Sequence, residues 1–230
     1  VENSKMIIAQ VNPKVPRVHG DSFVHVDDID YLVHKEEELL EFDPIVATDT
    51  AKEIAGYVST LIEDGATLQV GYGIIPNAIL SHLDEKEDLG IHTEMLSEDL
   101  ANLIKEGIVT NKKKTLHPGK SIGTFLMGTK DLYDFVDNNP GIELHPTDYV
   151  NDPLTIAKNY KMTAINTALQ VDLTGQVCAD SLGYSFYSGI GGHADFMRGA
   201  GYAEDGKSII ALSSTAQNGE VSRIVTHLNE

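Results

Sequence analysis

Strand-like and helix-like segments alternate along the chain from residue 46 onward. Thr50-x-x-Glu53 has the form of a capping box, and apolar side chains then follow at three- and four-residue spacing as far as Ile62, which predicts a helix ended near Gly65. A strand is expected over residues 67–70, and Gly71-Tyr72-Gly73 forms a turn before the next helix. Such alternation is typical of an α/β domain with a largely parallel sheet and flanking helices.

The pattern changes after residue 160. Residues 162–172 and 176–180 surround Leu173-Thr174-Gly175, which predicts a β-hairpin. Residues 208–213 and 221–228 predict a second hairpin around residues 217–220. Both would add antiparallel strands to the edge of the sheet.

Both ends of the chain have the pattern of regular structure. Residues 5–11 predict a buried strand, and residues 222–228 predict another. A chain with such ends resembles a piece of a longer protein, and a processed or tagged complete protein is the alternative.

The charge balance limits the partners. Seventeen Lys and Arg stand against 35 Asp and Glu, a formal charge of −18 in 230 residues. A field of this sign repels nucleic-acid backbones and anionic membranes, so neither is expected as a partner. Cys178 is the only cysteine, which excludes an intrachain disulfide and fits a reducing, cytoplasmic location.

Three segments could carry chemistry. Gln69-Val70-Gly71-Tyr72-Gly73 joins a strand to a helix, where glycines let a ligand approach the backbone, and an ordinary tight turn is the alternative. The run from Gly189 to Gly201 is rich in small residues whose amides can hold an oxyanion, and a close-packed loop is the alternative. From pattern alone, Glu94 in the segment 90–95 does not stand out among the acidic residues.

Other signals are weaker. His19-x-Asp21, His25-x-Asp27 and His193-x-Asp195 could be read as ligand pairs, but no zinc-type spacing supports them, so no metal site is expected. Cys178 in an alternating strand is typical of a small buried hydrophobe. Lys112-Lys113-Lys114 is most simply a solvated turn.

Taken together, the chain resembles the acetyl-CoA hydrolase/transferase family, and within it the 4-hydroxybutyrate and butyryl-CoA:acetate CoA-transferases. The resemblance rests on motifs in the family's order over nearly the whole sequence. They are Pro16-Arg17-x-His19-Gly20-Asp21, residues 65–74, Gly90-Ile91-His92-Thr93-Glu94-Met95, residues 189–201, Ser213-Ser214-Thr215-Ala216 and Ser222-Arg223-Ile224-Val225.

The resemblance implies a CoA-transferase-like fold. Residues 1–45 would be the tail of a preceding α/β domain with a linker, and residues 46–230 the C-terminal domain with the catalytic glutamate. Glu94 falls at that glutamate. Residues Gln69, Val70, Gly71, Tyr72 and Gly73, with Gly191 and Gly192, fall at the CoA-binding loops. Gln217 stands where the family usually has a lysine associated with CoA, so a charge contact there is in doubt.

The implied activity is transfer of CoA between short carboxylic acids, such as 4-hydroxybutyrate or butyrate with acetate. A glutamyl-CoA thioester would be the intermediate, since a carboxylate nucleophile belongs to the same chemical class as the acids exchanged. CoA thioesters are then substrates, and no permanently bound cofactor is expected. An acyl-CoA hydrolase and a CoA-binding fragment without turnover are the alternatives, and a homo-oligomer is left open.

Overall fold

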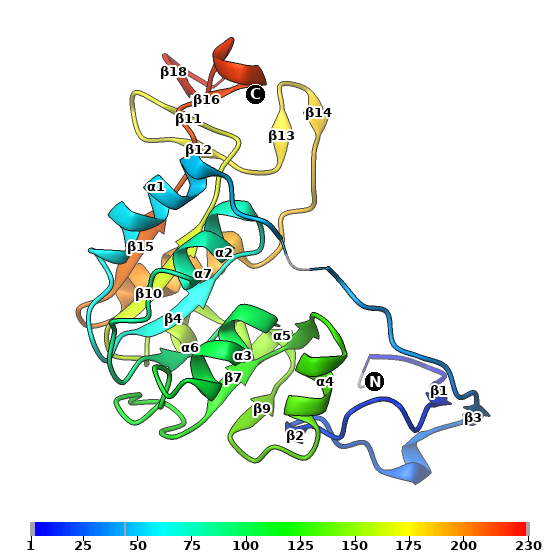
Figure 1. Cartoon of the computed structure of the whole chain (residues 1–230). Helices are drawn as coiled ribbons and strands as arrows, with labels where there is room; N and C mark the ends of the chain where they lie inside the picture. Colours follow the sequence, from blue (N-terminus) through cyan, green and yellow to red (C-terminus); the bar gives the residue numbers. More distant parts are fainter. Residues whose placement is uncertain (1–2, 44, 229–230) are drawn as a thin grey trace.

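The computed structural model describes residues 3–43 and 45–228. Its centre is a parallel sheet in the order β15-β10-β4-β5. The strands are β4 (Thr67–Val70), β5 (Gly90–Ile91), β10 (Met162–Asn166) and β15 (Lys207–Ile210). Every residue of β4 and β10 is buried, as expected for inner strands covered on both faces. The predicted α/β class with a largely parallel sheet is confirmed (Figure 1).

A second parallel sheet, in the order β2-β9-β7, lies beside the first. It contains β2 (His19–Gly20), β7 (Ser121–Gly123) and β9 (Ile142–Leu144). A parallel pair of β6 (Met95–Ser97) and β8 (Phe125–Met127) continues in the same region. A bridge between His92 and Ile122 joins the segment after β5 to β7, so the two sheets meet near residue 92.

Helices cover both sheets, and their apolar faces form the core. One large apolar cluster contains side chains that are completely buried, among them Ala55, Leu68, Ile79, Leu89 and Ile91. A smaller cluster surrounds Phe196. The helices are α1 (Asp49–Ser59), α2 (Ile74–Leu80), α3 (Glu98–Lys105), α4 (Lys130–Val136), α5 (Thr147–Val150), α6 (Pro153–Ile156) and α7 (His193–Tyr202), with the short 3-10 turns η1 (Val26–Asp28) and η2 (Gln217–Gly219).

The start of α1 differs from the prediction. Thr48, not Thr50, is the N-cap, and its hydroxyl accepts a hydrogen bond from Ala51 N at 3.3 Å. The helix ends at Ser59, and Gly65 has its left-handed conformation (φ +73°) in the later turn before β4. Thr48 and Thr50 both suit a cap chemically, and the packing of the apolar stripe determines which one lies at the first turn.

The predicted hairpins are right only in part. β11 (Gln170–Asp172) does pair antiparallel with β12 (Val177–Cys178), but β10 before it is an inner strand of the central sheet. The second hairpin consists of β16 (Thr215–Ala216) and β17 (Val221–Ser222) around η2. Residues 208–213 therefore do not pair with residues 221–228: β15 lies parallel to β10, and β18 (Ile224–Val225) lies parallel to β11. A further hairpin joins β13 (Ser181–Leu182) and β14 (Ser185–Phe186).

The N-terminal residues form an extension beside the main body (Figure 1). β1 (Ile8–Val11) pairs in parallel with β3 (Tyr31–His34), but every residue of β3 is exposed and Ile8 has 61% of its surface exposed. The expected burial of residues 5–11 is therefore wrong in this structure, because no layer covers this two-stranded sheet. Strand β2 ties the extension to the body through β9. The domain boundary near residue 45 stays a prediction.

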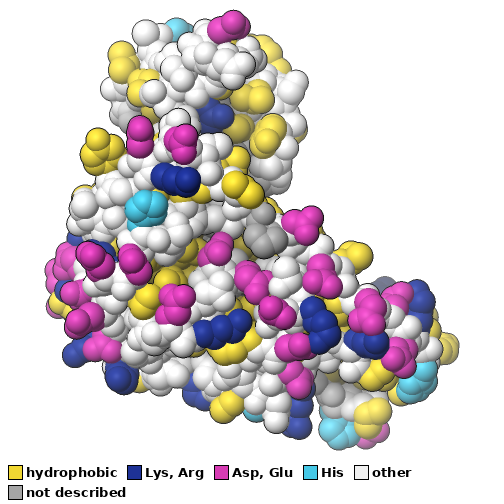
Figure 2. Space-filling view, viewed as in Figure 1, with side chains coloured by type: hydrophobic (Ala, Val, Ile, Leu, Met, Phe, Trp, Pro, Cys, Tyr) yellow, Lys and Arg dark blue, Asp and Glu magenta, His cyan; other side chains and the backbone are white. Residues whose placement is uncertain are grey.

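The surface reflects the composition. Figure 2 shows acidic side chains spread over the body and the N-terminal extension on the face in view, interspersed with fewer basic ones. Within the described part of the chain, no helix has the length and apolar character needed to cross a membrane.

Candidate active site

Glu94 lies on the segment that connects β5 to β6, and the backbone of this segment is held from both sides. His92 N donates to Leu68 O at 3.0 Å and Thr93 N donates to Ile122 O at 3.0 Å. The carbonyl of Glu94 accepts hydrogen bonds from Thr124 N at 2.8 Å and Phe125 N at 3.2 Å. His92 and Thr93 are buried while Glu94 is half-buried. The fold therefore fixes the backbone and leaves the carboxylate accessible.

The Glu94 side chain reaches a cavity of about 400 Å³. The cavity is lined chiefly by three segments that are far apart in sequence: residues 93–95, residues 69–72 at the end of β4 and in the turn after it, and residues 188–193 up to the start of α7. Seven of the eight residues proposed from the sequence line it, namely Gln69, Val70, Gly71, Tyr72, Glu94, Gly191 and Gly192. The structure thus brings the predicted segments to one place at the carboxyl end of β4, where α/β sheets commonly bind ligands.

Gly192 lies directly against the carboxylate of Glu94. A Cβ atom built on Gly192 would come within 2.5 Å of Glu94 Oε2 and within 2.5 Å of Asn151 Nδ2. A Cβ atom essentially never makes contacts that short, so any residue other than glycine here would shift the Glu94 carboxylate or the Asn151 amide. Asn151, which the sequence did not single out, is a buried neighbour whose Oδ1 has no hydrogen-bond partner.

The turn at Gly191 and Gly192 aims the start of α7 at the cavity. Gly191 has φ +56°, a left-handed conformation that glycine adopts without steric cost. Gly192 is the N-cap of α7, and no side chain caps the helix. The first N–H groups of a helix have no intrahelical acceptor, so His193 and Ala194 present donors and the positive end of the helix dipole at this edge of the cavity.

A buried amide pair sets the position of the loop after β4. Gln69 Nε2 donates to Asn166 Oδ1 at 3.2 Å, and Asn166 Nδ2 donates to Gln69 Oε1 at 2.9 Å. Gly71 N donates to Ile165 O at 2.9 Å, and a Cβ on Gly71 would lie 3.0 Å from Asn166 Oδ1. Gln69 therefore acts on the cavity chiefly by fixing the loop against β10, which the sequence pattern did not reveal.

Gly73 lines a neighbouring cavity of about 460 Å³ instead. Tyr72, Thr167 and Ser188 line both cavities, so the two adjoin. Arg223 is the cationic side chain among the described residues around the second cavity. Gln217 lies in η2 with φ 50° and lines neither cavity.

Two buried ionisable groups support the Glu94 segment. His92 Nε2 lies 2.9 Å from Val150 O, and burial lowers the pKa of His92 to about 3, so the ring is neutral. Lys114 Nζ donates to Ile91 O and Lys120 O, both at 2.7 Å, and burial lowers its pKa to about 7. The interpretation of Lys114 as part of a solvated turn is therefore wrong, because its side chain crosses under Gly90 with 3% of its surface exposed.

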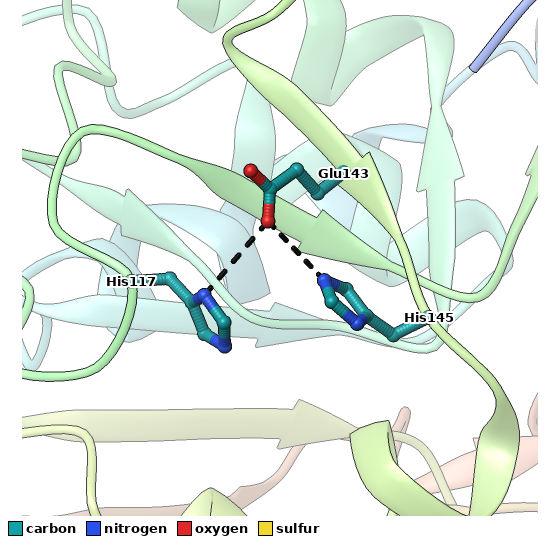
Figure 3. A group of neighbouring side chains, drawn as sticks. All are labelled: His117, Glu143 and His145. Atoms are coloured by element: carbon teal, nitrogen blue, oxygen red, sulfur yellow. Dashed lines mark hydrogen bonds and ion pairs between the residues drawn. The ribbon is translucent and has the colours of Figure 1, made fainter. Parts of the chain in front are cut away.

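The candidate ligand pairs noted in the sequence have other roles or no shared partner. His25 Nδ1 accepts a hydrogen bond from Asp27 N at 3.2 Å and so caps η1. Cys178 is buried, as expected, beside Ser181. A different group, His117, Glu143 and His145, places three ligand atoms within 4.8 Å of one another (Figure 3). No sequence pattern indicated this group, because His117 is far from the other two residues along the chain.

Comparison with known proteins identifies similar proteins and a matching family model. Residues 128–230 match the model of the acetyl-CoA hydrolase/transferase C-terminal domain. The 4-hydroxybutyrate coenzyme A transferase of Clostridium kluyveri is 54% identical over 228 residues, which cover 99% of this chain and 53% of that protein. The chain thus spans about half the length of the curated relatives that it matches.

Solved structures agree with the sequence matches. The crystal structure of RipA from Yersinia pestis is 40% identical with a TM-score of 0.93, covering 99% of this chain and 52% of that one. The 4-hydroxybutyrate CoA-transferase structure from Porphyromonas gingivalis is 41% identical with a TM-score of 0.89, covering 97% and 54%. These similarities establish that the chain belongs to the acetyl-CoA hydrolase/transferase family.

Proposed function

We propose that this chain carries the glutamate-bearing half of a CoA-transferase that exchanges CoA between short carboxylic acids, with Glu94 as the nucleophile. The observation that carries the proposal is the contact of the Glu94 carboxylate with Gly192 at the edge of the cavity. It brings a nucleophile next to the free amides of a helix N-terminus. Similarity to two 4-hydroxybutyrate CoA-transferases supports the same activity here.

In the first step, a Glu94 carboxylate oxygen attacks the carbonyl carbon of an acyl-CoA. The C–S bond breaks, CoA leaves as the thiolate, and a mixed anhydride remains. The thiolate then attacks the glutamyl carbonyl carbon, the anhydride C–O bond breaks, and the first acid leaves as its carboxylate. A second carboxylate repeats the two steps in reverse, so that the new acyl-CoA and free Glu94 are produced. No proton or external base is required.

Each attack places negative charge on a carbonyl oxygen. The amides of His193 and Ala194, together with the dipole of α7, are suited to hold this oxyanion because no side chain competes for them. Removing one such donor typically lowers the rate by about 10²–10³. The rigid backbone hydrogen bonds of Thr93 and Glu94 keep the nucleophile in reach, which is the positioning that transfer between two acids requires.

The two adjoining cavities fit a long substrate. We assign the thioester end to the cavity of Glu94 and the remainder of CoA to the neighbouring cavity, past Tyr72 and Gly73. The phosphates of CoA need positive charge in a chain of net charge −18, and Arg223 supplies it in the second cavity. This assignment does not depend on Gln217, which agrees with the absence of a lysine there.

The acids exchanged are proposed as 4-hydroxybutyrate or butyrate with acetate, by similarity to the named relatives. Because the chain spans about half of the relatives' length, the activity is proposed for the full-length enzyme. A cytoplasmic location and a homo-oligomeric state stay predictions.

Intact mass spectrometry tests the intermediate. The full-length enzyme is mixed with butyryl-CoA or acetyl-CoA and no acceptor acid, and the expected product is one adduct of CoA less one water, mapped to the peptide that contains Glu94. Glu94→Gln serves as the matched control and should give no adduct. An adduct on another residue would reject Glu94 as the nucleophile.

Thiol release distinguishes transfer from the alternatives. A transferase releases little free CoA from butyryl-CoA whether or not acetate is present, and with acetate it forms acetyl-CoA and butyrate. Steady release of free thiol without acetate would favour a hydrolase. Calorimetric binding of CoA without an adduct or turnover in the full-length enzyme would favour a binding role.

A further inference from the structure

Two histidines and a glutamate meet beside strand β9 of the second sheet (Figure 3). Glu143 lies on β9 and His145 follows two residues later, so their side chains lie on the same face of the extended chain. His117 comes from the loop between residues 111 and 120, where it has the left-handed φ of 51°. The three side chains are only 15–26% exposed. The fold therefore gathers them from two segments and partly removes them from water.

The distances are close to those of a metal site. Glu143 Oε2 is 3.2 Å from His145 Nε2 and 3.8 Å from His117 Nδ1. Ligand atoms about 2.0–2.2 Å from a tetrahedral zinc ion lie roughly 3.3 Å apart. The three ligand atoms all lie within 4.8 Å of one another, so side-chain rotations would be needed to bring them to a common centre.

Tyr149 on α5 orients the histidines. Its hydroxyl lies 2.7 Å from His117 Nε2, and its ring packs at 5.2 Å from the His145 ring and 5.8 Å from the His117 ring. With the proton of His117 on Nε2, donated to Tyr149, the lone pair of Nδ1 points to Glu143. A partner on the second ring nitrogen is the usual way that proteins fix a metal-binding histidine.

We propose that His117 Nδ1, Glu143 Oε2 and His145 Nε2 bind one divalent transition-metal ion of the zinc class. Two imidazoles with one carboxylate favour zinc, cobalt or nickel over magnesium and calcium, which prefer oxygen ligands. The ion would link the 111–120 loop to β9. None of the three residues lines the cavity of Glu94, so the metal-site proposal can be tested independently of the proposed transferase activity.

One cation opposes this binding. Lys120 Nζ is 3.3 Å from Glu143 Oε1 and also donates to Pro140 O. Lys120 contacts Glu143 Oε1, whereas the proposed ion binds Oε2. The lysine therefore orients the carboxylate, and its positive charge repels the ion. The proposal therefore predicts that removing this charge tightens binding, which a hydrogen-bonded cluster without metal affinity would not show.

The test uses the purified chain after dialysis against EDTA. Zinc is titrated in against a chromophoric chelator, and cobalt is added separately to record its visible absorption. We expect one ion per chain, a cobalt spectrum typical of four-coordination, and a melting temperature raised by about 5–10 °C at a zinc concentration 100 times Kd.

Four variants decide between a metal site and a hydrogen-bonded cluster. His145→Ala should weaken zinc binding by about 100-fold or more and Tyr149→Phe by roughly 10-fold, whereas Lys120→Gln should tighten it by roughly 10-fold. His25→Ala removes an exposed histidine paired with a carboxylate and should leave binding unchanged. Circular dichroism confirms folding. Absence of stoichiometric binding, or equal affinity in the parent, Tyr149→Phe and Lys120→Gln proteins, would overturn the proposal.

Discussion

Replacing Lys114 by methionine tests how a buried lysine supports the Glu94 segment. Its ammonium group donates to Ile91 O and Lys120 O, and its stem packs beneath Gly90. Burial lowers the pKa of Lys114 from 10.5 to about 7, and the charge of Glu143 opposes this shift only in part. Methionine keeps most of the volume of the stem and removes both the donors and the titration.

The sign of the pH effect follows from proton binding. Between pH 7 and 10.5 the unfolded chain holds a proton on Lys114 that the folded chain has largely lost. The free energy of unfolding therefore rises with pH in this window, by at most about 1.4 kcal/mol per pH unit from this group. Between pH 7.5 and 9.5 the gain amounts to about 2 kcal/mol.

The absolute effect of the substitution is less informative than its pH dependence. Methionine removes a desolvation cost of roughly 4 kcal/mol at pH 7, but it leaves two buried carbonyls without a donor, at about 1–3 kcal/mol each. These contributions nearly cancel. The two proteins share all their other titrating groups. A difference between their slopes of unfolding free energy against pH therefore reports the titration of Lys114.

Urea unfolding at pH 7.5, 8.5 and 9.5 in buffer with EDTA measures this difference. The histidines with lowered pKa values titrate below this range, and the raised pKa values of Lys14, Lys130 and Lys161 lie above it. We expect the parent protein to gain about 2 kcal/mol relative to Lys114→Met. Parallel pH profiles would refute the inference that Lys114 is buried with a lowered pKa.

Three further predictions concern the site and the first helix. Gly192→Ala should reduce transfer by roughly 10²-fold or more in the full-length enzyme because the new methyl group displaces the Glu94 carboxylate, whereas Gly56→Ala, with nothing within 4 Å, should leave the rate unchanged. Glu94→Asp should transfer CoA about 10²-fold more slowly and raise hydrolysis relative to transfer, since a shorter side chain leaves space for water. Parallel assays with and without acetate measure the transfer and hydrolysis rates, and an unchanged ratio of the two would contradict the prediction. Thr48→Ala should lower the free energy of unfolding by about 1 kcal/mol and Thr50→Ala by less than about 0.5 kcal/mol; equal losses in urea would contradict the assignment of the cap.

Features that depend on neighbouring residues could be predicted from the sequence. Ser97, a residue type that favours helix N-caps, caps α3, with Leu100 N donating to its hydroxyl at 3.4 Å, because a cap involves only the first turn of a helix. The strand over residues 67–70 and the turn after it are also confirmed. For the candidate site, the motifs indicated three segments, and the structure gathers them around one cavity.

Features that depend on the pairing of distant segments could not be predicted from the sequence. The apolar run over residues 121–127 is divided at Thr124, whose N–H donates to Glu94 O, into β7 and β8, which lie in different sheets. The sequence pattern of β15 would suit a hairpin strand equally well. Helix α7 follows β10 and precedes β15 in the chain and packs against both strands, which places β15 parallel to β10.

The sequence by itself determined the α/β class, the turn after β4, and the segments that hold the candidate nucleophile. Only the tertiary structure decided that Lys114 is buried, that Gly192 contacts the carboxylate of Glu94, and that His117 meets Glu143 and His145. The physical reason is the range of the interactions. Hydrogen bonds within a turn are fixed by adjacent residues, whereas burial and side-chain clustering depend on which distant segments the sheets bring together.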